Sequence, residues 1–346
     1  MPTTSTLAVS ELDFDTIKSS LQTYLKGQTE FSDYDFESST LSILLNVLSY
    51  NTYHNSFYLN MIANEMFLDS AQLRNSVVSR AKMLNYTPRS ARGATAAVDT
   101  IVTPGDSPTS ITVAANTQFT STVNGISYIY VTSQSTSLIS QPNGTFTGTL
   151  NIVEGTPLQH RFTVNTTNPV RYILPNENTD TTSFTVRIQE STSNTSVITY
   201  SLLSDLSSVN SISTIYYLQE NEDNLYEVYF GDDVFGKKPI NGNIVLIDYR
   251  VCNGTATNGA NTFATPDSLG GYSNFTTTTS SVAQGGALQE TIDSIKYNAP
   301  FKYQAQDRLV TMQDYKNIIL SENGDLSSIN VWGGEEMTPP RYGRVF

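Results

Sequence analysis

The apolar positions divide the chain into three zones with different periodicities. Up to about residue 90 they recur at spacings of three and four, which is typical of helices. From about 91 to 290 they form short runs that alternate with polar residues, which is typical of strands. After that, helical spacing returns. The sequence therefore predicts an α+β chain of several domains: a helical domain over 1–90, antiparallel β domains over 91–290, and the start of a mixed α/β domain over 291–346.

The helical zone begins and ends with a short helix. The first has apolar residues at helical spacing and is expected to end near Gly27: Leu12, Ile17, Leu21 and Leu25. The last is expected to start after Asp69, because an aspartate there can cap free N–H groups and Gln72 follows at capping-box spacing. Its predicted apolar face consists of Val77, Val78, Ala81 and Leu84. Pro88 is expected to stop it, since proline cannot continue the hydrogen-bond ladder.

A longer helix between these two is apolar on most of its circumference. One stripe comprises Leu41, Leu44, Leu45, Leu48, Leu59, Ile62 and Met66. A second stripe beside it comprises Val47, Tyr50, Tyr53, Phe57 and Met61. A helix that is apolar on most sides must be buried on most sides. Because a segment of about 90 residues offers few partners, two interpretations stay open: the central helix of a local bundle, or a helix buried between subunits.

On the second interpretation, helices over about 39–84 lie against other chains rather than closing on their own β domain. The predicted interface consists of the apolar residues of this long helix and its end: Leu41, Leu44, Leu45, Leu48, Tyr53, Phe57, Leu59, Ile62, Met66 and Phe67.

The central zone contains β-branched and aromatic runs separated by turn signals. Strands are predicted at 111–113, 128–131, 145–150 and 183–188. Turns are predicted at Asn124-Gly125 and Asn241-Gly242, among others. This pattern favours a sandwich-type antiparallel arrangement. Residues 107–153 contain no charged residue. Charges usually protect edge strands, so this stretch is either covered by a neighbouring chain or reflects the composition of the whole protein.

The last zone predicts a capped helix that begins near Thr311 and a strand over 329–332. Residues 344–346 then resemble the start of another strand. One helix and two strands do not complete a domain. We therefore expect this zone to be truncated, either because the chain is the front part of a longer polypeptide or because the C-terminal domain is missing.

Composition narrows the class of function. The chain has 19 Lys and Arg against 32 Asp and Glu, a net charge of −13, which disfavours phosphate binding and hence a nucleic-acid partner. Its single cysteine, Cys252, rules out an intrachain disulfide and a thiol zinc cluster. Residues 1–14 lack the pattern of a signal peptide, and no apolar run is long enough to span a membrane, so we expect synthesis in the cytosol and no membrane insertion.

The search for catalytic chemistry finds no candidate residues. The two histidines, His54 and His160, lie in a predicted helix and a predicted strand, where core, interface or surface roles are expected. Asp232-Asp233 has the pattern of a turn, and Glu335-Glu336 are adjacent residues that do not converge by themselves. No phosphate-binding loop or nucleophile elbow is present in the sequence. We therefore predict no enzyme activity, no metal and no cofactor.

Three groups of segments, in matching order, resemble one family. The first group is 50–53, 64–71 and 84–91; the second is 226–236, 239–242, 247–249 and 258–261; the third is 299–301, 310–311, 314–315, 333–336 and 339–343. They resemble the baseplate J-like proteins, the family that includes the wedge subunit of contractile phage tails. Family members of the large-phage type continue well past this C-terminus with a domain implicated in dimer contacts, which puts that contact in doubt for this chain.

The resemblance implies a structural subunit of the tail baseplate in the virion, made and assembled in the bacterial cytoplasm. Two copies would pair non-equivalently with a second wedge protein through a helical bundle. Six such wedges would surround the hub and contact the sheath-initiating proteins. Rearrangement of this ring would trigger sheath contraction. The family implies no catalytic residues. The alternative is a receptor-binding or glycan-degrading tail component, because β proteins rich in Ser, Thr and Asn also suit that role. A secreted adhesin is disfavoured by the missing signal peptide.

Overall fold

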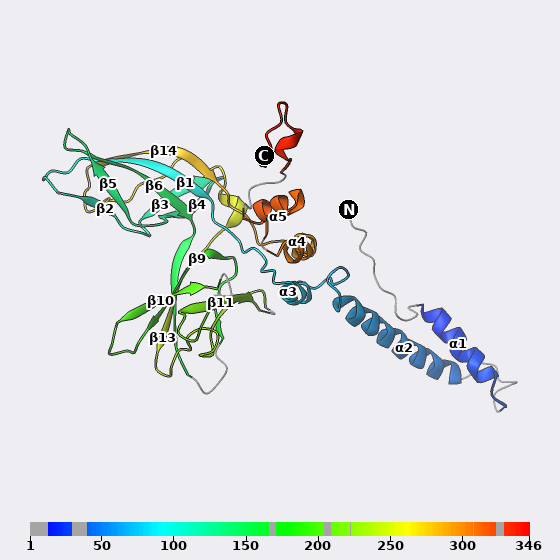
Figure 1. The fold of residues 1–346 in the computed structure, drawn as a ribbon. Helices are drawn as coiled ribbons and strands as arrows, with labels where there is room; N and C mark the ends of the chain where they lie inside the picture. The colour runs from blue at the N-terminus through cyan, green and yellow to red at the C-terminus, as the bar shows by residue number, and fades with distance from the viewer. Residues whose placement is uncertain are drawn as a thin grey trace. The chain divides into compact units, whose positions relative to one another are not determined.

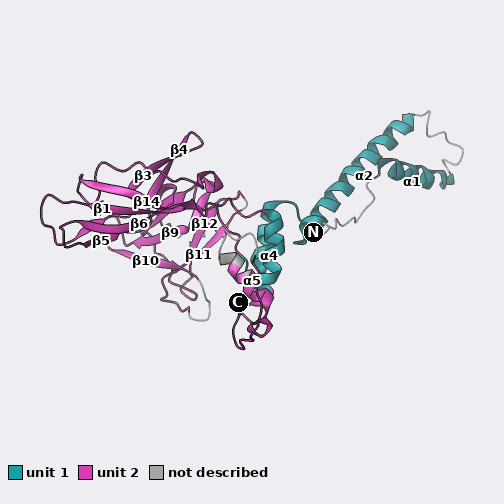
Figure 2. Ribbon diagram, turned by 90° about the horizontal axis from the view of Figure 1, so that it is seen from above, with its two compact units in different colours: residues 1–86, 292–303 teal, residues 87–291, 304–346 magenta. Residues whose placement is uncertain are grey.

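The computed structural model describes residues 13–29, 40–165, 171–203, 209–221, 223–306, 308–322 and 329–346. The chain forms two compact units, one of residues 1–86 with 292–303 and the other of 87–291 with 304–346 (Figure 2). The predicted α+β class is confirmed, since helices come first, antiparallel sheets follow, and a small helical region comes last (Figure 1). Residues 292–303, expected to open a C-terminal domain, group instead with the N-terminal helices.

The first unit contains three N-terminal helices: α1 (Phe14–Lys26), α2 (Thr40–Glu65) and α3 (Arg74–Met83). Helix α1 begins where Asp13 accepts a hydrogen bond from the N–H of Thr16 at 3.2 Å. It ends where Gly27 donates to the carbonyls of the last turn, as the sequence predicts. The predicted first apolar position, Leu12, lies outside the described residues.

The start of α3 corrects one prediction. Asp69 does not cap this helix, which begins five residues later with Leu73 at the cap position and no capping side chain. The Glu65 carboxylate at the end of α2 takes that role, accepting from the N–H of Gln72 at 2.9 Å and of Leu73 at 3.3 Å. The 66–73 turn brings a longer side chain to the free N–H groups, an approach that local capping rules do not describe.

The end of α3 also differs from the prediction. The helix ends at Met83, well before Pro88, because Asn85 adopts a left-handed φ of 57° and donates its N–H to the Lys82 carbonyl at 3.0 Å. Asparagine tolerates this conformation better than most residues. The helix stop is therefore a turn at Asn85 rather than the proline.

A small core holds α3 against helix α4 (Ile292–Ala305) within the first unit. Three of the four predicted apolar residues of α3 are buried in it, and Leu84 is partly buried. The core comprises Ala71, Val77, Val78, Ala81, Tyr86, Ile295 and Ala299. Lys296 adds a hydrogen bond from its Nζ to the Asp69 carbonyl at 3.0 Å.

The second unit contains two seven-stranded sheets. The first has the order β14-β1-β6-β4-β3, with β5 pairing both β6 and β2. Its strands are β1 (Thr95–Val102), β2 (Ile111–Val113), β3 (Gln118–Val123), β4 (Ile126–Thr132), β5 (Thr136–Ser140), β6 (Phe146–Glu154) and β14 (Phe275–Gln284). The predicted Asn124-Gly125 turn joins β3 to β4, and both residues have positive φ, as a tight hairpin requires.

The second sheet has the order β7-β13-β9-β10-β11-β12-β8. Its strands are β7 (Thr156–Thr163), β8 (Tyr172–Ile173), β9 (Thr179–Gln189), β10 (Val197–Leu202), β11 (Ile215–Glu220), β12 (Tyr226–Phe230) and β13 (Ile244–Val251). Pairing is antiparallel except between β10 and β11. All seven strands lie between β6 and β14 in the sequence, so this sheet is an insertion into the first one. Each sheet has its own apolar core.

The charge-free stretch 107–153 forms β2 to β6, and most of its strands are paired within the first sheet. Strands β4 and β6 have partners on both sides. On the far side of β3, Thr120 exchanges backbone hydrogen bonds with Ala264 at 3.1 and 2.7 Å. Part of the β3 edge is therefore covered by this chain itself. Coverage by a neighbouring chain was one of the two interpretations of the charge-free stretch.

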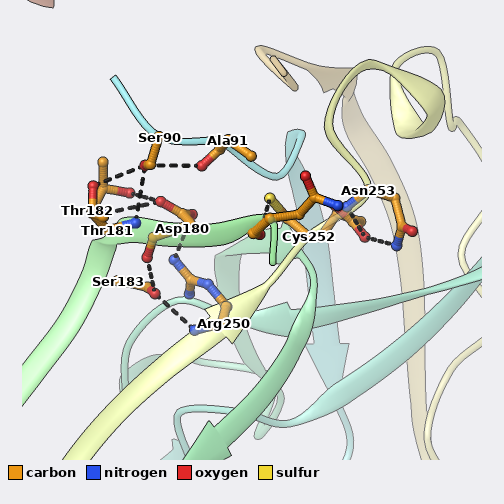
Figure 3. A network of polar contacts seen from close by, with 11 residues as sticks. Ser90, Ala91, Asp180, Thr181, Thr182, Ser183, Arg250, Cys252 and Asn253 are labelled. Atoms are coloured by element: carbon orange, nitrogen blue, oxygen red, sulfur yellow. Dashed lines mark hydrogen bonds and ion pairs between the residues drawn. The ribbon is translucent and has the colours of Figure 1, made fainter. Parts of the chain in front are cut away.

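The chain crosses between the two sheets at Glu154-Gly155 and at Cys252-Asn253, and hydrogen bonds tie these crossings together. Glu154 is fully buried, and its carboxylate accepts from the N–H of Asn253 at 3.1 Å and from its Nδ2 at 2.8 Å. The Cys252 N–H donates to the Asn178 carbonyl at 3.2 Å. Figure 3 shows this network beside Asn253 and Cys252.

A second part of the same network anchors the segment that enters the first sheet. The hydroxyls of Ser90 and Thr181 lie 2.8 Å apart, and the Thr181 N–H donates to the Ser90 hydroxyl at 3.1 Å (Figure 3). Beside them, buried Asp180 faces Arg250 at 3.7 Å. Two charged groups buried as partners cost less than either would alone. The junction is therefore held by polar contacts rather than by a continuous apolar core.

The junction predicts a pH dependence of stability. Burial raises the pKa of the Glu154 carboxyl, against the hydrogen bonds from Asn253 that lower it. The folded chain therefore keeps this proton at a higher pH than the unfolded chain does. The Glu154 contribution to the free energy of unfolding rises as pH falls from neutral through the raised pKa, and levels off below the unfolded value of about 4.3. Urea unfolding at pH 4–7 should show this slope, and Glu154→Gln should flatten it.

The control for this experiment is Glu177→Gln, which removes the same charge from an exposed position of the same unit. In this variant the free energy of unfolding should keep the dependence on pH that Glu154 contributes. An identical dependence of unfolding on pH in the wild type and in Glu154→Gln would contradict the assignment.

The last described residues confirm one prediction and correct another. Helix α5 (Met312–Glu322) follows Thr311, whose N–H donates to the Asp314 carboxylate at 2.7 Å while the Asp314 N–H donates back to the threonine hydroxyl at 3.2 Å. No strand forms over 329–332. Instead, Trp332 and Phe346 exchange backbone hydrogen bonds at 3.0 and 3.1 Å, next to a single Gly333–Val345 bridge.

Candidate assembly interface

Helix α2 turns most of its large apolar side chains away from its own chain. Seven of the ten predicted interface residues are exposed, by 47–62%: Leu44, Leu48, Phe57, Leu59, Ile62, Met66 and Phe67. Leu41 and Tyr53 are half-buried. Leu45 is only 4% exposed, so its side chain packs within this chain and is not available to another.

The side of α2 that faces its own chain is small and polar. The buried residues Leu45, Ser49, Ser56 and Asn60 recur at spacings of four and seven, which places them on one stripe of the helix. Helix α1 contacts α2 (Figure 1) and contributes one buried apolar residue, Ile17. The Ser49 hydroxyl is buried without a hydrogen-bond partner in the described part of the chain. The intrachain contact of α2 therefore buries little of its apolar surface.

Further apolar residues share the exposed side. Val47, Tyr50 and Met61 belong to the second predicted stripe, but the predicted interface omitted them. Ile43 and Tyr58 were not identified as interface residues at all. All five are exposed, by 42–63%. Four of them lie three or four residues from a predicted interface residue, and Ile43 lies four residues from Val47 of the second stripe. This spacing is the signal that could have identified them.

A polar pair interrupts the exposed apolar side near its middle. Asn55 donates from Nδ2 to Oδ1 of Asn51 at 2.9 Å, and both residues are exposed. The side before this pair is mainly aliphatic, and the side after it is rich in aromatic residues and methionine. An asparagine in an otherwise apolar helix interface is a known device for selecting one register, because a shifted partner leaves the amide unpaired.

His54 belongs to an aromatic row on α2 rather than to a catalytic group. Its ring centroid lies 4.3 Å from that of Tyr50, 5.6 Å from that of Tyr53 and 6.4 Å from that of Tyr58. His54 is half-buried in this row, and its role in an interface stays a prediction. The row stiffens one side of the helix with large rings that have few rotamers, a property that suits a contact surface.

The exposed apolar side of α2 is large for a surface helix. With about 1.5 Å of rise per residue, its 26 residues extend over about 39 Å. Each large side chain buried there by a partner would contribute about 1.5–3 kcal/mol. Contiguous apolar patches of this kind mark interaction sites on soluble proteins. A helix or helices of matching length could cover it by side-chain packing.

Among the described residues, the other side chains considered in the sequence analysis do not come together as a catalytic or metal-binding group. The ring of His160, on β7, lies 4.4 Å from that of Phe162. Asp232 accepts from the N–H groups of Val234 and Phe235, both at 3.0 Å, which lower its pKa and confirm the predicted turn. Among the described residues, no group of three or more His, Cys, Asp or Glu side chains could hold a metal ion. No described helix is both long and apolar enough to cross a membrane.

The helical segment matches a known family model. Residues 13–86, which contain α1, α2 and α3, match the family model described as the helical domain of gp6-like baseplate wedge proteins. The chain is also 28% identical over 341 residues to the baseplate wedge protein gp6 of Enterobacteria phage T4, an alignment that covers 90% of this chain and 50% of that protein. The chain thus spans about half the length of this relative.

A structural comparison gives a weaker likeness. The cryo-EM structure of the anti-feeding prophage baseplate, 6-fold symmetrised, contains a similar chain with a TM-score of 0.32 and 12% identity. The match covers 98% of this chain and 70% of that one. A TM-score of this size does not establish a shared overall fold. The sequence comparisons are what confirm the predicted resemblance to baseplate wedge proteins.

Proposed function

We propose that this chain, which resembles the baseplate wedge proteins of contractile-tailed phages over most of its length, is a structural subunit of such a wedge. The observation that carries the proposal is the exposed apolar side of α2, which lies inside the segment that matches the gp6-like helical domain. A helical domain with its apolar residues turned outward is a part of an assembly, because burial of that surface requires other chains.

The partners that fit this surface are other helices. In the proposed wedge, α2 packs in a bundle with the same helix of a second copy and with helices of another wedge protein. The bundle buries the aliphatic and aromatic parts of the exposed side, and the Asn51–Asn55 pair selects the register. The proposal includes further contacts to hub and sheath-initiating proteins, made when wedges join around the tail axis, and no nucleic-acid or membrane partner.

The proposed role is mechanical rather than enzymatic, and its place is the tail baseplate of the virion after assembly in the host cytoplasm. Rearrangement of the wedge ring on host attachment would release sheath contraction. Such a switch requires two packings of similar free energy. Support for a structural role comes from the relative, which is named as a baseplate wedge protein, and from the interface itself.

Cryo-microscopy of intact virions tests the proposal directly. A tag on an exposed loop, such as the turn at Gly105 before β2, should appear in the ring of wedges around the hub. Density for the tag at fibre tips would overturn the wedge assignment. That outcome would favour the alternative, a receptor-binding or glycan-degrading tail component, and binding or cleavage of host polysaccharide would then separate those two roles.

A further inference from the structure

We infer that Asn124, at the tip of the hairpin between β3 and β4, is a site of spontaneous chemical modification by water. Its side-chain amide is lost as ammonia, and an aspartyl or isoaspartyl residue takes its place. The site lies in the first sheet (Figure 1) and does not depend on α2 or on assembly. The inference therefore goes beyond the proposed function.

The nucleophile of this reaction is the backbone nitrogen of the next residue. The Gly125 nitrogen attacks the side-chain carbonyl carbon of Asn124 and passes its proton to the side-chain NH₂ group, which leaves as ammonia when its bond to that carbon breaks. The product is a five-membered succinimide ring. Water then adds to one of the two ring carbonyls and opens the ring, which gives aspartate or isoaspartate. Either product puts a carboxylate into the stretch 107–153, which has no charged residue.

Both residues of this pair are exposed, and their reacting groups are free. Across the residues that the structure describes, neither the Asn124 carboxamide nor the Gly125 N–H makes a hydrogen bond. A Cβ atom placed on Gly125 would have no other atom within 4 Å. Water therefore reaches the site, and no hydrogen bond of these groups has to open before the nitrogen turns toward the side chain.

The turn can also reach the geometry that ring closure requires. Positive φ at both residues, 52° for Asn124 and 83° for Gly125, is that of a type I′ turn. Rotation of the peptide plane between them gives a type II′ turn, in which Asn124 keeps its positive φ and takes a ψ of about −120°. At that ψ the Gly125 nitrogen eclipses the Asn124 side chain, as a five-membered ring demands. Glycine permits the accompanying change in the sign of its φ, and both turns match the twist of the flanking strands.

The four other Asn-Gly pairs among the described residues are held by hydrogen bonds. The N–H groups of Gly144, Gly242 and Gly259 donate to backbone carbonyls at 3.0, 3.1 and 2.7 Å. The Asn253 Nδ2 donates to the Glu154 carboxylate at 2.8 Å. Ring closure at these pairs therefore requires a hydrogen bond to open first. The four pairs are Asn143-Gly144, Asn241-Gly242, Asn253-Gly254 and Asn258-Gly259, and Asn323-Gly324 lies outside the described residues.

Peptide mapping of the full-length chain tests the assignment. The folded protein is incubated at mildly alkaline pH and digested under acidic conditions, and mass spectrometry measures amide loss at each Asn-Gly pair and separates aspartyl from isoaspartyl peptides. Modification at Asn124 should be at least tenfold faster than at Asn143. Tenfold in rate corresponds to about 1.4 kcal/mol, which is what opening about one or two hydrogen bonds costs. In urea, where the fold and its hydrogen bonds are lost, the two sites should react at comparable rates.

Asn124→Gly is the control variant, because a Gly-Gly pair also fits a type I′ turn but has no side-chain amide to lose. This variant should lack the product assigned to position 124 and keep the slow reaction at Asn143. Modification of Asn124 in the folded wild type no faster than that of Asn143 would overturn the inference. So would the same preference for Asn124 in urea, because the preference would then come from neighbours in sequence and not from the fold.

Discussion

Glutamate in place of Leu44 and Ile62 together should prevent incorporation of this chain into baseplates while leaving its own fold intact. Both side chains are more than 60% exposed, so the free energy of unfolding of the isolated chain should change by less than about 1 kcal/mol. In the proposed bundle the same positions would be buried. Loss of two buried apolar side chains costs about 3–6 kcal/mol, which corresponds to a loss of affinity of about 10²- to 10⁴-fold. Burial of two unpaired carboxylates would add to this.

Complementation measures this effect with the full-length chain. Phage that lack the gene are supplied with each variant, and the fraction of the chain that sediments with baseplates is determined. Asn46→Glu is the control for an added carboxylate, because it places one of the two negative charges on the same helix at an exposed position that is already polar. The control should incorporate as the wild type does. Incorporation of the double variant at the wild-type level would show that the exposed side of α2 is not an assembly interface.

Alanine in place of Gly93 should lower the free energy of unfolding by at least about 3 kcal/mol, the upper part of the range for overpacked sites. A Cβ atom at this position would lie 2.0 Å from the Glu154 carbonyl oxygen and 2.9 Å from its carbon. Both are backbone atoms of β6, which is held to the adjacent residue by the bond from the Glu154 N–H to the Ala94 carbonyl at 2.8 Å. Relief of the clash therefore requires separation of β1 from β6 beside the crossing between the sheets.

Gly105→Ala is the comparison for this prediction. No atom lies within 4 Å of a Cβ placed there, and its φ is outside the left-handed range. Its stability should be unchanged or raised by up to about 1 kcal/mol, because alanine restricts the unfolded chain. Chemical denaturation of the two variants provides the measurement. Similar midpoints for both would mean that the approach of Gly93 to β6 does not limit stability.

Local patterns predicted the elements of this chain well, because each depends on neighbours in sequence. The spacing of apolar residues predicted α2, and the β-branched residues of Ile111–Val113 predicted β2. The Asn124-Gly125 pair predicted a hairpin since both residues must take positive φ there. The predicted N-terminal cap of α3 was wrong because the capping side chain is not a close neighbour in sequence. Asp69 has the right residue type, but the carboxylate that reaches the start of α3 is Glu65.

The sequence patterns did not predict which strands pair over long distances in the chain. Nothing in the strand pattern indicates that β7 to β13 form a sheet inserted between β6 and β14, or that Glu154 and Asn253 meet where the chain crosses. Strand order depends on contacts between residues far apart in the chain, which periodicity does not encode. The uncharged stretch 107–153 therefore directed attention to strands that are mostly paired within their sheet.

For α2, the sequence by itself determined that the helix is apolar on most of its circumference, which left burial in a local bundle and burial between subunits both open. Only the tertiary structure decided which side is left for a partner. Leu44 and Leu45 belong to the same predicted stripe, yet the first is exposed and the second is buried beside Ser49. The physical reason is that burial depends on where neighbouring segments of the fold lie, and a helix with apolar residues all around gives no sequence signal for that side.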